Sequence, residues 1–517
     1  MGEQEKSDGY RKNGDSQYEA ANVSLFYNPR SGLQMKFEWT HSNYLIHLAG
    51  PLNDSMFYAG PQSATRSRNY YNPNIHIPSL SIDWQVNPST LLKLTSGVVL
   101  GYRSSVMFDK PATIADSIVT ATGTYNTRQV DIDNYHSYTT ELRLLQTWSL
   151  WGKKFTLAAG VQYMNNDLHR RQQGEGTTGS DYDLTLSEPG WGRDLHFKTG
   201  NVAAFAENRW ELFKGFALNA GARMEMGESR MSGTTIYYPE RELPDTIRHN
   251  FPLLGINAEY TPNSNISFYA GWSQAYRPVI FKDIVPGSLY EYTDKNLKDA
   301  YGYNMEAGFR GAWKFLTWDI TAFHLWYSNR IGTLAETDSL GNLRIFRTNI
   351  GDSRTRGVEI FVQGSFPIST KTRLTLFSST AWMDARYQGA VIRSGNGNIS
   401  VDGNKVESVP EWISRNGLTI EHGPMSVSIL YSYTASSFAD ALNSVTPSAS
   451  GATGLAPAYH LTDINLTWVL TRNISVRLNG NNIFNQQYFT KRPQFYPGPG
   501  IWPSDGRTLS ATVIVRI

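Results

Sequence analysis

One pattern extends over the whole chain: alternating segments of about ten residues are joined first by a short connection and then by a long polar one. The short connections are Pro29–Gly32, Asn87-Pro88, Trp151–Lys154, Phe213–Gly215, Pro262-Asn263, Trp313-Lys314, Pro367–Thr370, Gly423-Pro424 and Thr471–Asn473. The long ones lie near 43–78, 103–136, 166–197, 229–247, 277–301, 331–353, 386–408, 437–456 and 485–506. Short turns at one end and long loops at the other predict a series of antiparallel hairpins standing side by side. A soluble sandwich or propeller does not keep this asymmetry through successive hairpins.

Within the segments, side-chain polarity alternates with period two, which predicts strands and not helices. In residues 215–225, Phe216 and Leu218 belong to an apolar face, whereas Arg223 and Glu225 belong to the opposite one. Charges on the second face indicate that this face meets water. The sequence therefore predicts strands that separate an apolar environment from an aqueous one.

Composition favours a membrane environment for the apolar face. Charged residues make up 18% of the 517 residues, below the roughly 25% of soluble domains, and aromatic residues make up 13%. In a membrane barrel only alternate residues face lipid, and aromatic rings gather at the two membrane interfaces. We therefore expect an all-β protein, a transmembrane antiparallel β-barrel.

The strand count predicts an incomplete barrel. Residues 19–517 accommodate about nineteen strands, whereas single-chain bacterial barrels have even numbers. Three more strands would give twenty-two, the size associated with plugged transporters. We expect residues 1–18 to be the remnant of an outer loop, and the strands at 19–29 and 507–517 to be unpaired or poorly paired edges. The polar start, without the apolar region of a signal peptide, also leads us to expect missing N-terminal strands.

Several other classes of protein are not indicated. The formal net charge of +2 does not indicate the strongly basic surface that binds nucleic acid. The absence of cysteine excludes thiol nucleophiles and cysteine-ligated metals. The ten histidines form no recognised metal-binding spacing, and the acidic residues are too dispersed to nominate a general acid–base pair. We predict no catalytic residues, no metal ligands and no resident cofactor, so the chain is not expected to be an enzyme.

Five motifs in this order give the chain a resemblance to a known family. They are Gly271–Pro278 (GWSQAYRP), Asn304–Gly311 (NMEAGFRG), Asn349–Gly351 with Arg356–Glu359 (NIG and RGVE), Asn481–Tyr488 (NNIFNQQY) and Gly506–Thr508 (GRT). The sequence resembles TonB-dependent receptors along nearly its whole length. The N-terminal part is similar to the ferric-citrate subgroup, on Asp8–Asn13 and Gln62–Tyr70, with Pro61 where that pattern has an arginine.

The resemblance implies a receptor and transporter of the bacterial outer membrane that takes up a ferric chelate, either ferric citrate or another siderophore. It implies energy from the TonB–ExbB–ExbD complex through a plug domain that has no counterpart in this sequence. Outer-membrane lipid and the ferric chelate are the other expected partners, and we expect a monomer. The alternatives are a passive channel, a receptor for haem, cobalamin or a glycan, and a membrane-embedded enzyme or adhesin.

A ferric chelate of this kind is an anion, and carboxylates are bound best by the bidentate fork of arginine. Arg66 and Arg68 are two residues apart, so an extended loop would point both to one side. The predicted ligand contacts, all in or beside long loops, are Arg66, Arg68, Asn69, Arg103, Tyr276, Arg277 and Lys282.

Overall fold

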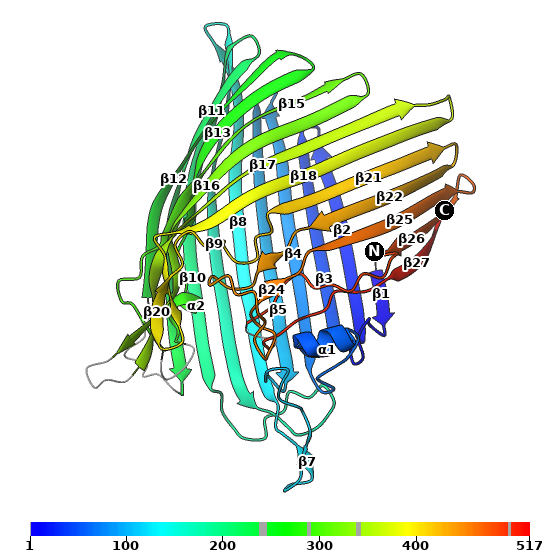
Figure 1. The fold of residues 1–517 in the computed structure, drawn as a ribbon. Coiled ribbons are helices and arrows are strands. Elements are labelled where there is room, and N and C mark those ends of the chain that lie inside the picture. Colours follow the sequence, from blue (N-terminus) through cyan, green and yellow to red (C-terminus); the bar gives the residue numbers. More distant parts are fainter. Residues whose placement is uncertain (1, 237–245, 287–290, 338–342, 495–497, 517) are drawn as a thin grey trace.

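The computed structural model describes residues 2–236, 246–286, 291–337, 343–494 and 498–516 (Figure 1). In this part of the chain, a 21-stranded sheet consists of a ladder of twenty antiparallel strands and one short strand, β14 (Glu291–Thr293), that pairs in parallel with β17. Along the ladder, each strand pairs with the next. Its strands are β1 (Gly2–Ser7), β2 (Ser16–Arg30), β3 (Leu33–His47), β4 (Tyr70–Asn87), β5 (Thr90–Met107), β8 (Gln129–Leu150), β9 (Lys153–Glu175), β10 (Arg193–Phe213), β11 (Phe216–Thr235), β12 (Thr246–Asn263), β13 (Ile266–Arg277), β15 (Ala300–Trp313), β16 (Leu316–Thr337), β17 (Leu343–Pro367), β18 (Thr372–Gln388), β21 (Trp412–His422), β22 (Met425–Thr434), β25 (Tyr459–Val469), β26 (Ile474–Asn481) and β27 (Thr508–Val515).

The remaining elements belong to the long loops. They are α1 (Asp54–Ala59), α2 (Phe281–Ile284) and the short strands β6 (Ile118–Val119), β7 (Thr124–Tyr125), β19 (Val391–Ser394), β20 (Gly397–Ser400), β23 (Ser437–Phe438) and β24 (Leu455–Ala456). Neither helix in the described ranges is long and apolar enough to cross a membrane.

Short and long connections alternate as predicted. The nine short turns at one end of the sheet comprise two to four residues each, and the long loops gather at the other end (Figure 1). We call these two ends the turn end and the loop end. At the tight turn between β10 and β11, Gly215 has φ +79°, and a Cβ there would stand 2.2 Å from the carbonyl oxygen of Thr261. Only glycine fits this turn without strain.

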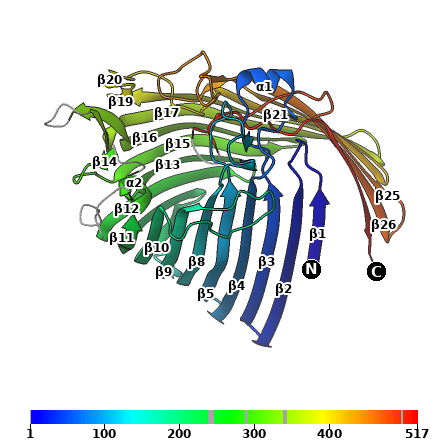
Figure 2. The same cartoon turned by 90° about the horizontal axis from the view of Figure 1, so that it is seen from below.

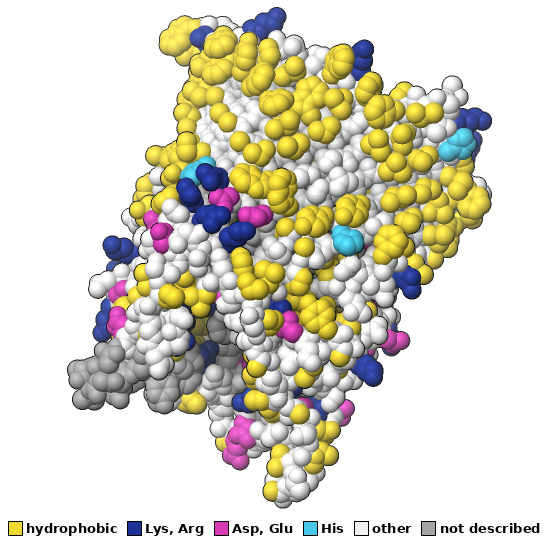
Figure 3. Space-filling model, in the orientation of Figure 1, with side chains coloured by type: hydrophobic (Ala, Val, Ile, Leu, Met, Phe, Trp, Pro, Cys, Tyr) yellow, Lys and Arg dark blue, Asp and Glu magenta, His cyan; other side chains and the backbone are white. Residues whose placement is uncertain are grey.

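The two faces of the strands also follow the predicted alternation. On β22, Met425, Ile429 and Tyr431 belong to one face and remain exposed, although they are apolar or aromatic. Figure 3 shows similar side chains covering the outer wall in a broad hydrophobic band. An apolar outer band over a polar inner face is the arrangement of a transmembrane β-barrel.

The N-terminal edge differs from the expectation. Residues 1–18 were expected to be a loop, but Gly2–Ser7 forms β1 and pairs with Ser16–Ala21 of β2. Apart from Gly2, these residues are polar, and they show no alternation in polarity, so their pairing depends on the main chain and left no pattern in the sequence. The ladder has one strand more than the nineteen predicted.

The two edge strands lie opposite each other across the open side of the sheet (Figure 2). Among the described residues, β27 pairs with β26 and no ladder joins it to β1 or β2. A loop near each edge of the sheet nevertheless contacts the other. The amide of Leu52 donates to the carbonyl oxygen of Ile501 at 2.9 Å, and the amide of Ile501 donates to the carbonyl oxygen of Leu52 at 2.7 Å. The same contact is covered by a buried apolar cluster that includes Phe57, Ala456 and Phe489.

An ion pair strengthens this loop junction. Arg492 donates two hydrogen bonds to Asp54, at 2.6 and 2.8 Å, and further bonds to the carbonyl oxygens of Gly451 and Leu455, both at 3.0 Å. The Arg492 side chain is 1% exposed. Residues 438 positions apart in the sequence are therefore held together without a strand ladder.

Replacing Asp54 with alanine should loosen the junction, because the buried Arg492 charge would lose its carboxylate. Breaking a buried pair costs on the order of 3–5 kcal/mol. We expect limited proteolysis to cut the 435–458 and 482–507 loops at least ten times faster in Asp54→Ala.

The control is Arg230→Ala, which removes an ion pair whose arginine is 73% exposed. This variant should be cut at the native rate, because exposed pairs contribute little. Equal rates for Asp54→Ala and the native protein would contradict the structural role of the pair.

Candidate ligand site at the loop end

Three loops meet above the ends of β4, β5, β8 and β9: residues 48–69, 108–128 and 176–192. Arg66 is at the centre of the junction between the first two loops and is 2% exposed. It donates to the carbonyl oxygens of Phe108, Pro111 and Ile114, at 3.1, 3.0 and 3.2 Å. Burial lowers the pKa of Arg66 below its ordinary value. Carbonyl groups of the 108–128 loop thus surround the guanidinium.

Arg68 ties the third loop to the same junction. Its guanidinium makes a bidentate pair with Asp116, at 2.6 and 3.0 Å, and donates to the carbonyl oxygens of Thr178 and Gly179, both at 3.0 Å. The side chains of Arg68 and Asp116 are each 1% exposed. One arginine therefore links residues from all three loops.

Asn69 and Arg128 complete this junction. The Asn69 side-chain oxygen accepts from the amide of Phe108 at 2.8 Å, and Arg128 donates to the carbonyl oxygens of Arg68 and Asp181 at 2.8 and 2.9 Å. The structure thus brings three predicted contacts, Arg66, Arg68 and Asn69, into one buried network. Binding of a ligand by these side chains would require them to exchange existing hydrogen bonds, and their ligand role stays a prediction.

Arg103 has a different position, on the opposite face of β5 from the apolar residues of the outer wall. It pairs with Asp133, which is 2% exposed and also accepts two hydrogen bonds from Arg170 at 2.9 and 3.1 Å. Both arginine side chains remain partly exposed, at 35% and 27%. Two guanidinium groups share one carboxylate, so this cluster carries one excess positive charge on the inner wall.

Sequence reasoning missed Arg170. Strand pairing places Arg170 opposite Asp133, and Asp133 opposite Arg103, in one row across β9, β8 and β5. The sequence does place the three side chains on the same face of their strands. To recognise that they are neighbours, however, the register of both strand pairs must be known.

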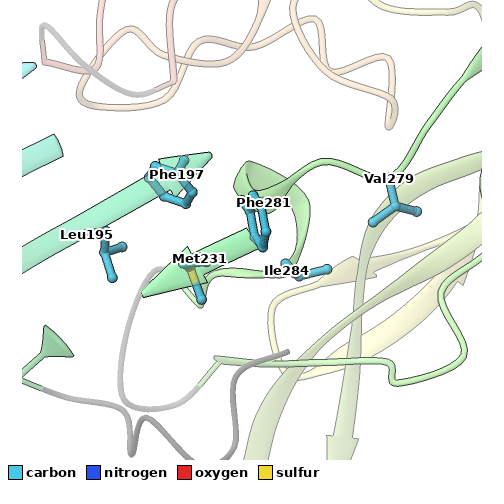
Figure 4. Packing of buried hydrophobic residues seen from close by; sticks show 6 residues of the cluster. All are labelled: Leu195, Phe197, Met231, Val279, Phe281 and Ile284. Atoms are coloured by element: carbon cyan, nitrogen blue, oxygen red, sulfur yellow. The ribbon is translucent and has the colours of Figure 1, made fainter. Parts of the chain in front are cut away.

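The other predicted contacts lie around α2, which belongs to the apolar cluster drawn in Figure 4. Arg277, at the end of β13, donates to Asp283 at 2.8 Å, and Tyr276 donates to Asp299. Lys282 is exposed. The nearby apolar residues pack α2 against β10 and β11; they are Leu195, Phe197, Met231, Val279, Phe281 and Ile284. This loop therefore folds onto the wall and presents Lys282 at its surface.

The seven predicted residues thus form two groups. Arg66, Arg68 and Asn69 come from the loop before β4 and Arg103 comes from β5, whereas Tyr276, Arg277 and Lys282 come from β13 and α2. In the described part of the chain, each group makes its hydrogen bonds and ion pairs with its own surroundings, and none of these bonds joins one group to the other.

Further down the wall, β10–β13 and β15 line a pocket of about 380 Å³. Its polar side chains include Glu207, Arg223, Asn257 and Glu306, and glycines at 221, 255 and 271 leave the inner surface open beside them. Among the described residues, no group of three or more His, Cys, Asp or Glu is arranged to hold a metal ion. The cluster of Arg103, Asp133 and Arg170 presents two partly exposed guanidinium groups, which suit carboxylate or phosphate ligands.

Replacing Arg68 with alanine should disorder the loop junction and not the barrel. The change would leave Asp116 buried without its partner, at a cost on the order of 3–5 kcal/mol. We expect hydrogen exchange to accelerate in residues 108–128 and 176–192 and to stay unchanged in the strands.

Arg143→Ala is the matched control, because Arg143 is 59% exposed and pairs with Glu141 within the same strand. Unchanged exchange in both loops of Arg68→Ala would contradict the junction.

Comparisons with known proteins agree on one architecture. The family model described as TonB dependent receptor-like, beta-barrel matches residues 7–483. The fold is similar to that of the ferric citrate transporter FecA in its unliganded form, with a TM-score of 0.79 and 18% identity over 98% of this chain and 71% of that one. It is also similar to the siderophore receptor PiuA from Acinetobacter baumannii (TM-score 0.76, 16% identity, 99% and 76% covered) and to the copper transporter OprC (TM-score 0.74, 16% identity, 99% and 75% covered). At these identities the solved structures establish the fold alone.

Proposed function

The chain belongs to the TonB-dependent receptor-like β-barrel family, and from that premise we propose that it takes part in uptake of a ferric chelate, ferric citrate or another siderophore. The family is a bacterial outer-membrane class whose members bind a ligand and depend on TonB for energy. We place this protein in the outer membrane, acting as a receptor and transporter and not as an enzyme.

The observation that carries the proposal is the inner-wall cluster of Arg103, Asp133 and Arg170. Its excess positive charge and partly exposed guanidinium groups suit a compact polycarboxylate anion. Asp133 orients both arginines, so their forks are held in place before a ligand arrives. The partial burial of the two arginines also strengthens their attraction for an anion.

The wider mouth contributes in two ways. We propose that Arg277 and Lys282 approach the ligand from the α2 side, since Lys282 is exposed and Arg277 donates to Asp283, the residue next to Lys282. Tyr276 supports this side, and the junction held by Arg66, Arg68 and Asn69 fixes the shape of the opposite side. The solved structures support a ferric chelate only by analogy, since FecA and PiuA are described as a ferric citrate transporter and a siderophore receptor.

The proposal assigns the strand ladder from β1 to β27 to the barrel domain and requires a plug domain and TonB–ExbB–ExbD as partners. In this mechanism the outer loops capture the chelate, the inner-wall arginines retain it, and TonB acts on the plug to open a path through the lumen. A monomer is sufficient for each of these steps.

The test is a titration of the full protein with iron-loaded citrate and with iron-free citrate. We expect Arg103→Gln together with Arg170→Gln to weaken binding of the iron-loaded form about 10- to 100-fold. That range corresponds to roughly 1.5–3 kcal/mol for the loss of hydrogen bonds between charged groups.

Lys93→Gln is the control. Lys93 lies on β5, an even number of residues from Arg103 and so on the same face, but toward the turn end, where it pairs with Asp83 at 3.0 Å. The Lys93→Gln variant should bind iron-loaded citrate as tightly as the native protein does. Equal binding by the native protein and the double variant would contradict the arginine site. Absence of any binding would remove the citrate assignment and direct the search to haem, cobalamin and glycans.

A further inference from the structure

A charged patch lies on the outer wall of the barrel, away from the candidate ligand site. We call it the arginine patch; it consists of Arg354, Arg356, Arg386 and Lys405. Figure 3 shows basic and acidic side chains gathered at the border of the hydrophobic band. Arg354 and Arg356 are on β17, an even number of residues from Ile360, an apolar side chain that is 41% exposed. Because strand faces alternate, these arginines share the outer face with Ile360.

Strand pairing places the cations of the patch side by side. Arg354 of β17 is directly opposite Arg386 of β18. On its other side, the main chain of Arg386 pairs with that of Lys405 in an isolated antiparallel β-bridge. Directly opposed residues have Cβ atoms about 4.5–5.5 Å apart, and like charges at this spacing repel each other. Three positive charges therefore stand in one row across neighbouring segments.

The carboxylates nearby do not balance these charges. Asp384 accepts from Arg386 at 2.7 Å and pairs with Arg356 at 3.2 Å, and Glu411 pairs with Lys405 at 2.7 Å. Four cations thus share two carboxylates. Arg354 takes no part in these pairs, and its Nε is buried without a hydrogen-bond partner in the described part of the chain. An anion from outside the chain would balance this excess charge.

The position of the patch identifies the kind of anion. One pleat toward the turn end, the same outer rows contain Val358, Trp382 and Trp412, which are paired across β17, β18 and β21. Trp326 of β16 is opposite Arg354. Tryptophan gathers where hydrocarbon meets headgroups, so the arginine patch lies at the level of the headgroups and directly above the lipid chains.

We propose that the arginine patch binds the phosphate of an anionic lipid headgroup in the membrane layer at the loop end. Guanidinium groups bind phosphate oxygens through paired hydrogen bonds, and the adjoining apolar wall receives the acyl chains. Arg354 and Arg386 bind the phosphate, while Asp384 orients Arg356 and Arg386 through its ion pairs with both. The inference needs the barrel in a membrane and is independent of the transported ligand, so it goes beyond the proposed function.

The experiment measures lipid binding to the full protein in a neutral detergent by native mass spectrometry. We expect phosphatidic acid, which has an exposed phosphate monoester, to bind more tightly than phosphatidylglycerol, and phosphatidylcholine to bind at least ten times more weakly. Replacing Arg354, Arg356 and Arg386 together with glutamine should weaken phosphatidic acid binding at least tenfold. Arg354→Gln alone breaks no side-chain hydrogen bond among the described residues and should weaken phosphatidic acid binding about threefold with the fold intact.

The matched control replaces Lys198, Arg230 and Arg248 with glutamine. These changes remove the same charge, but each residue has a carboxylate partner, namely Asp167 for the first and Glu228 for the other two. The control should change binding less than threefold. Phosphatidic acid binding that is unaffected by both the single and the triple patch variants would overturn the proposal. So would displacement of the lipid by inorganic phosphate at equal concentration, which would identify a site for free phosphate instead.

Discussion

The structure depends on one constraint: every main-chain amide and carbonyl within a membrane must find its partner inside the protein, because lipid offers none. The ladder from β1 to β27 meets this constraint by pairing each strand with its neighbours in sequence. Because successive side chains of a strand point to opposite faces, the ladder also separates an apolar outer set of side chains from a polar inner set. The inner arginines follow from this division, whereas the outer arginine patch lies where the apolar outer band ends.

The loop end adds what the ladder lacks, which is contact between distant parts of the chain. Strand pairing joins sequence neighbours, whereas Asp54 and Arg492 join loops 438 residues apart. Arg66 and Arg68 serve a similar purpose among three successive loops, and they do so with hydrogen bonds to carbonyl oxygens more than with ion pairs. These polar interactions act together with small buried apolar clusters at the same end, such as the one that contains Phe57 and Phe489.

The fold could be predicted from the sequence because turns, alternation and loop length are local properties. The prediction placed nine turns and the facing of strands such as β11 and β22 correctly. It missed β1, whose polar residues carry no alternation, and it missed α1 and α2 within the loops. The site was harder, because the surroundings of Arg66 and Arg68 come from three irregular loops whose folding no local pattern specifies. Arg170 was missed for a related reason, since its importance depends on the register of three strands.

The most direct test of a transmembrane barrel asks which residues of one strand face lipid and which face water. The chain has no cysteine, so single cysteines can be introduced one at a time into β17 of the membrane-reconstituted protein. We predict that cysteines at Glu359 and Gln363 react with a water-soluble thiol reagent, whereas cysteines at Ile360 and Val362 are protected by lipid. Equal labelling at all four positions would contradict a lipid-facing outer wall around an aqueous lumen, on which both the inner-wall ligand site and the arginine patch depend.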